Sequence, residues 1–60
     1  MDKIKIGDTQ YILRIKAGNQ NLNYTGTIFS INEHWIFIKD KFNKTLIFPI
    51  HSIISLEEIE

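Results

Sequence analysis

The stretch "YTGTIFSINEHWIFIKD", residues 24–40, decides the fold of this chain. Its β-branched and aromatic residues follow the two-residue period of a strand, and Asn32, Glu33 and His34 interrupt that pattern with a turn. The stretch therefore predicts a β-hairpin. A glycine inside a strand, as at Gly26, is typical of a sharp bend or a close backbone approach, and small closed barrels need such bends.

Both faces of the predicted hairpin carry bulky apolar side chains. Because side chains alternate across a strand, one apolar set points inward: Ile28, Ile36 and Ile38. The other set then points outward: Phe29, Ile31, Trp35 and Phe37. Shifting the register by one residue exchanges the two sets, but bulky apolar side chains still remain on the face away from the core. Several exposed large apolar side chains together mark an interface. The alternative is a barrel bent so strongly that one strand lines two parts of its core.

The rest of the chain supplies three more strands. Residues 9–17 alternate, residues 45–48 form a strand that Pro49 ends, and residues 53–60 form the last strand. Residues 18–23 form a turn-rich loop.

Two shorter features complete the predicted fold. Asn43 suits the left-handed position of the turn before residues 45–48, and residues 50–52 suit a short 3-10 turn. Residues 1–60 are thus expected to form a single all-β domain, a small five-stranded SH3-like or Sm-like barrel with a short 3-10 turn before the last strand.

Composition bounds the function. A chain of 60 residues buries only about 60% of its unfolded surface, so it usually needs additional support. It has no cysteine, and its two histidines lack the spacing of a metal site, so we expect no disulfide and no metal. Self-association is the support that remains. Seven basic and seven acidic residues cancel, which excludes the overall field of a non-specific duplex-DNA binder.

Targeting signals and catalytic motifs are not expected. The start, "MDKIKIGD", has no apolar run of a signal peptide, and no stretch approaches the roughly 18 apolar residues of a membrane span. We therefore expect a cytoplasmic protein with no membrane partner. The carboxylates of Asp8, Glu33 and Asp40 lie on separate turns, no serine occupies a nucleophile motif, and no glycine-rich phosphate loop exists. We therefore expect no catalytic residue, no enzyme activity and no cofactor.

Residues 24–56 resemble the Sm-like family, including its Hfq-like branch. The resemblance is carried by "YTGTIFSIN", "WIFIKDKFNKTLIF" and "IHSIISL". Gly26 stands at the family's second-strand glycine, Asn32 stands where an acidic residue or asparagine begins the next loop, and His51 stands on the family's histidine. Pro49 and Ile50 replace a tyrosine and a lysine of the family motif.

The resemblance implies a homo-oligomer, such as a ring, that binds single-stranded RNA or a small nucleotide at its loops. In such a ring the last strand of one copy pairs with the fourth strand of the next. The expected ligand contacts are Asn32, His34, His51, Lys39 and Lys41. The expected interface residues are Phe29, Trp35, Phe37, Ile47 and Ile54.

A second interpretation comes from the surplus apolar face alone. An SH3-like protein-interaction module would use Phe29, Trp35 and Phe37 to dock on a partner protein, as a small regulator or inhibitor, for example one encoded by a phage. Neutral charge and the missing lysine at Ile50 favour this interpretation, whereas the strand pattern and "IHSI" favour RNA binding. Each candidate also has a purely structural interpretation. His34 suits a solvated hairpin tip, and His51 suits a 3-10 turn in which it hydrogen-bonds only its own loop. Lysines around a hairpin turn keep it soluble and guard an edge, and Trp35 suits a core position.

Overall fold

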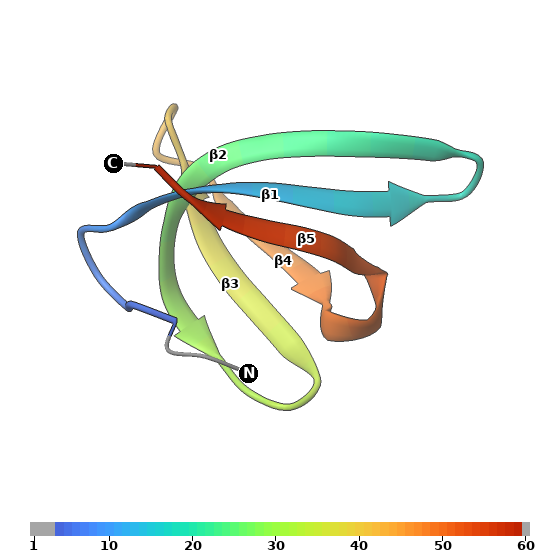
Figure 1. Cartoon of the computed structure of the whole chain (residues 1–60). Helices are drawn as coiled ribbons and strands as arrows, with labels where there is room; N and C mark the ends of the chain where they lie inside the picture. Colours follow the sequence, from blue (N-terminus) through green and yellow to red (C-terminus); the bar gives the residue numbers. More distant parts are fainter. Residues whose placement is uncertain (1–3, 60) are drawn as a thin grey trace.

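The computed structural model describes residues 4–59 and is built from β-strands (Figure 1). Its elements are β1 (Gln10–Ala17), β2 (Gln20–Ile31), β3 (Trp35–Asp40), β4 (Thr45–Pro49), the 3-10 turn η1 (Ile50–Ser52) and β5 (Ile53–Glu58). The predicted all-β class, the five strands and the 3-10 turn before the last strand are confirmed. Over these residues, no helix has the length and apolar character that crossing a membrane requires.

The strands form one antiparallel sheet in the order β4-β3-β2-β1-β5. The sheet is strongly curved but not closed, since β4 and β5 are its two ends and no ladder joins them within residues 4–59 (Figure 1). A single chain therefore does not close into the predicted barrel. Each end strand leaves one row of backbone groups unpaired with another strand, which is the usual liability of a sheet edge.

The long strand β2 pairs with two neighbouring strands in turn and so joins them into one sheet. Its first part pairs with β1 and its second part with β3, and Gly26 and Thr27 pair with both. β2 bends along its length as it passes from one partner to the other (Figure 1). The predicted close approach at Gly26 is confirmed, because a Cβ there would overlap the carbonyl of Lys39.

The loop predicted over residues 18–23 is wrong. Only Gly18 and Asn19 form the turn, with Gly18 at φ 63°, and β2 begins at Gln20. Asn23 is part of the ladder opposite Arg14, whose Nε donates to its Oδ1 at 3.1 Å. The polar asparagines misled the prediction because they lie on an exposed hairpin, where no burial demands apolar residues. The left-handed conformation predicted for Asn43 is confirmed, with φ 66°.

The core lies on the concave face of the curved sheet. Its buried side chains are Tyr11, Leu13, Ile15, Ile28, Ile36 and Ile38. The inward orientation predicted for the three hairpin isoleucines is confirmed. The outward orientation predicted for Ile31 is wrong, because Ile31 pairs with fully buried Ile36 and packs against the core.

A β-bulge explains the position of Ile31. The β2–β3 register shifts between Ile28 and Ser30, so Phe29 has no partner on β3. The extra residue returns Ile31 to the inner face while Phe29 stays outside. Bulges re-aim side chains in this way and are commonly functional.

Candidate interaction surface

A row of apolar side chains crosses the outer face of β2, β3 and β4. We call Phe29, Phe37, Ile47 and Trp35 the outer apolar surface. Phe37 pairs with Ile47, and its ring lies 6.0 Å from that of Phe29. Phe29, Trp35 and Ile47 keep 44%, 45% and 52% of their surface exposed. The face is therefore apolar without being covered.

Solvent exposure of this size is costly. Fully burying one large apolar side chain contributes roughly 1.5–3 kcal/mol, so the exposed halves of Phe29, Trp35 and Ile47 forgo about 2–4 kcal/mol together. Contiguous apolar side chains of this kind mark interaction sites. The curvature alternative, in which β2 and β3 line two parts of one core, does not account for them because these side chains face away from the core.

The outer apolar surface reaches one free edge of the sheet, and a similar residue lies at the other. Ile47 belongs to the end strand β4, and Ile54 belongs to the end strand β5 and is 49% exposed. Ile54 sits at the second bulge of the sheet, where Arg14 pairs with Ser55 but Ile15 pairs with Ile53. Both bulges therefore direct a large apolar side chain to solvent, Phe29 in β2 and Ile54 in β5.

The predicted ligand-binding histidines lie on two adjoining segments. The Asn32 side chain accepts hydrogen bonds from the backbone N–H groups of His34 and Trp35, both at 2.8 Å, which fixes the turn after β2. The Ile50 N–H donates to the His34 carbonyl at 2.9 Å, so η1, which carries His51, lies against this turn. Both histidines are exposed. Asn32 acts here as a turn former, with its side-chain oxygen already engaged.

The predicted ligand-binding lysines lie at the other end of β3. Strand β3 starts at Trp35, beside the histidine turn, and Lys39 and Lys41 come at or beyond its far end. Six residues of strand span roughly 20 Å. Lys41 extends over the Phe42 ring, with Nζ 5.5 Å from its centroid. The structure therefore does not bring the five predicted contacts together in one copy.

The turn that carries these lysines is held by Asp40. One carboxylate oxygen of Asp40 accepts the N–H groups of Phe42 and Lys44, both at 2.9 Å. Phe42 is left 72% exposed at the tip. Asp40 is thus structural, and Phe42 is an isolated apolar residue away from the outer apolar surface. Within residues 4–59, no cluster of histidine and carboxylate groups has the arrangement of a metal site.

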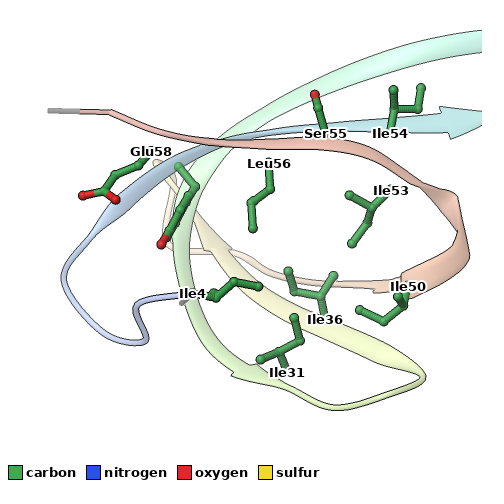
Figure 2. A pocket seen from close by; sticks show the side chains of 10 residues that line it. Ile4, Ile31, Ile36, Ile50, Ile53, Ile54, Ser55, Leu56 and Glu58 are labelled. Atoms are coloured by element: carbon green, nitrogen blue, oxygen red, sulfur yellow. The ribbon is translucent and has the colours of Figure 1, made fainter. Parts of the chain in front are cut away.

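An apolar cleft was not expected from the sequence. It has a volume of about 530 Å³ and lies between β5 and the facing ends of β2 and β3, with Ile4 and Ile50 also lining it (Figure 2). The lining residues come from six separate segments, so no local pattern in the sequence predicts the cleft.

No protein-family model matches this chain, and no curated protein or solved structure matches it either. The resemblance to the Sm-like family therefore rests on residues 24–56 of the sequence.

Proposed function

We propose that this chain is a non-enzymatic, Sm-like interaction module that self-associates through its two free sheet edges. The observation that carries the proposal is the pairing of features at those edges. Strands β4 and β5 end the same open sheet, and each presents a half-exposed outward isoleucine, Ile47 and Ile54. A second copy that places its β5 beside β4 extends the sheet and covers both side chains.

The charges at the two edges favour an antiparallel arrangement. Lys41 and Lys44 precede β4, whereas Glu57 and Glu58 end β5. An antiparallel register that sets Ile47 opposite Ile54 of the next copy also brings Lys44 opposite its Glu57. Opposite charges across an interface steer association and fix the register. Joining β4 to β5 is a head-to-tail contact, which produces a ring when the rotation between copies closes.

The outer apolar surface is continuous with this interface. Phe37 and Phe29 follow Ile47 on the same outer face, toward the middle of the sheet. A neighbouring copy that contacts Ile47 therefore also lies beside them. Assembly would thus supply the additional burial that a 60-residue domain needs. It would also pair the backbone groups left free at the two ends of the sheet.

The test is the mass of the protein in solution, measured by light scattering and native mass spectrometry across a range of concentrations. The wild type is expected to give a multiple of the 7.1 kDa chain. Ile47→Lys places a charge in the interface and is expected to give the single-chain mass. Phe42→Ser removes a more exposed apolar residue outside the interface and is the matched control. A wild type that stays a single chain at all concentrations contradicts the proposal. The outer apolar surface would then be expected to bind a different protein.

A second function, binding of single-stranded RNA or a nucleotide, is favoured by one contact. The hydrogen bond from Ile50 to His34 places two exposed histidines on adjoining segments, where flat side chains can stack on bases. Assembly would gather these ends from several copies. Binding of labelled single-stranded RNA is expected to weaken in His34→Ala and His51→Ala, but not in Lys41→Ala, which lies at the far end of β3. Equal losses in all three variants would instead indicate diffuse electrostatic attraction.

A further inference from the structure

We propose that the apolar cleft between β5 and the facing ends of β2 and β3 binds a small, uncharged aliphatic molecule that carries one hydrogen-bond-accepting oxygen, such as a ketone. This site lies on the inner side of the sheet and is distinct from the outer apolar surface. The proposal does not depend on self-association.

The lining of the cleft selects an apolar ligand. Isoleucine and leucine side chains from opposite sides face each other across it, with Ile53 and Leu56 of β5 directed toward Ile31 and Ile36 (Figure 2). Ile54 and Ser55 point away from this interior in the same view. A volume of about 530 Å³ lies within the range of roughly 300–1,000 Å³ typical of small-molecule sites. Such sites combine an apolar wall with a small number of polar groups that set orientation.

The polar group that sets orientation here is the Tyr11 hydroxyl. Tyr11 lines the cleft and is only 5% exposed. Its hydroxyl accepts a hydrogen bond from the Lys5 N–H at 2.9 Å, and among residues 4–59 it donates none. A hydroxyl both donates and accepts, so the proton of the Tyr11 hydroxyl remains available to a further acceptor. In the proposed complex, an oxygen of the ligand accepts this proton.

The rim of the cleft disfavours a charged ligand. Glu58 lines the cleft, and its Oε2 lies 3.1 Å from Lys5 Nζ. These two groups neutralise each other at the mouth. A carboxylate ligand would have to compete with Glu58 for Lys5, and an ammonium ligand would have to compete with Lys5 for Glu58. An uncharged oxygen leaves the ion pair intact and still accepts from Tyr11.

The experiment is a titration of the whole chain, labelled at its isoleucine methyl groups, with methyl heptyl ketone and followed by NMR. Methyl signals of Ile31, Ile36 and Ile53 are expected to shift, whereas that of Ile47 on the outer face is not. Nonane matches the ketone in chain length but lacks the oxygen, and it is expected to bind about three- to tenfold more weakly, the equivalent of one hydrogen bond. Nonanoate and nonylamine are expected to bind more weakly than the ketone.

Variants assign the contact to Tyr11. Tyr11→Phe keeps the ring but removes the donor, so it is expected to lower ketone affinity about three- to tenfold while leaving nonane affinity unchanged. Ile53→Phe fills the cleft and is expected to abolish ketone binding, and Phe42→Ser is the matched control. The titration is repeated with Ile47→Lys, so that a failure of self-association is not mistaken for a failure of this site.

The proposal is overturned by any of three results. The first is that the cleft methyl groups do not respond to the ketone. The second is that nonane binds as tightly as the ketone in the wild type, a comparison that holds even where a variant fails to fold. The third is that nonanoate or nonylamine binds more tightly than the ketone, which would mean that the ion pair at the rim opens for a charged ligand.

Discussion

Gly26 of β2 and Lys39 of β3 touch backbone to backbone. A Cβ added at Gly26 would overlap the Lys39 carbonyl oxygen and would lie 2.9 Å from the Lys39 carbonyl carbon. This contact occurs where β2 changes partners, since Gly26 pairs with Tyr11 on one side and with Asp40 on the other. The absence of a side chain is what allows the sheet to bend sharply at this point and form its concave core.

Gly26→Ala is expected to destabilise the domain by at least about 2 kcal/mol, because the atoms that must move are backbone rather than flexible side chain. Urea unfolding measures the change. Gly18→Asn is the matched control: Gly18 has φ 63° and open space around it, and asparagine tolerates that conformation. A Gly26→Ala variant as stable as the control would mean that the two strands separate at little cost.

Asn32 is predicted to stabilise the turn rather than to contact a ligand. Its side-chain oxygen holds the N–H groups of His34 and Trp35, and Asn32→Ala leaves both to solvent. We expect a loss of about 1 kcal/mol, which lowers the melting temperature of a domain this small by roughly 4–8 °C. Asn32→Asp keeps an acceptor and should retain most of the stability. If alanine and aspartate behave alike, the two hydrogen bonds are not what fixes this turn.

The inner and outer faces of the sheet are expected to respond differently to the same truncation. Ile36 is fully buried, so Ile36→Ala should cost about 2–5 kcal/mol and unfold much of the population. Ile47, on the neighbouring strand, is half exposed, so Ile47→Ala should change the stability of the single chain by less than about 1 kcal/mol. Its effect should appear instead in the solution mass. A large loss of stability on Ile47→Ala in a dilute sample would show that this side chain belongs to the core.

The sequence predicted local features well because each depends on neighbouring residues. Alternation identified the buried set Ile28, Ile36 and Ile38, and residue chemistry identified the close approach at Gly26 and the left-handed Asn43. These properties follow from side-chain period and backbone sterics.

Features that depend on register or on distant segments could not be predicted in the same way. A bulge adds one residue to one strand without changing its composition, so nothing in "TIFSI" announced that Phe29 lacks a partner and that Ile31 turns inward. Whether the sheet closes into a barrel depends on whether β4 reaches β5 after the whole sheet has curved. The contact that brings His51 beside His34 likewise joins segments far apart in the sequence, through the hydrogen bond from the Ile50 N–H to the His34 carbonyl.

The charges that face each other in the proposed assembly are expected to affect how strongly the copies associate. Lys44→Glu and Glu57→Lys each place like charges across the antiparallel contact of β4 with β5, so each variant alone should associate more weakly. An exposed pair contributes about 0.2–1 kcal/mol, so the expected loss of association is roughly two- to fivefold per interface at low salt, and it should shrink as salt screens the charges.

Mixing equal amounts of the two variants should restore association, because in an alternating assembly each altered edge meets an opposite charge. Light scattering of the single variants and of the mixture measures this. Lys39→Glu, which changes a lysine outside the two edges, is the matched control. A mixture that associates no better than its components would show that β4 does not face the β5 of the next copy in this register.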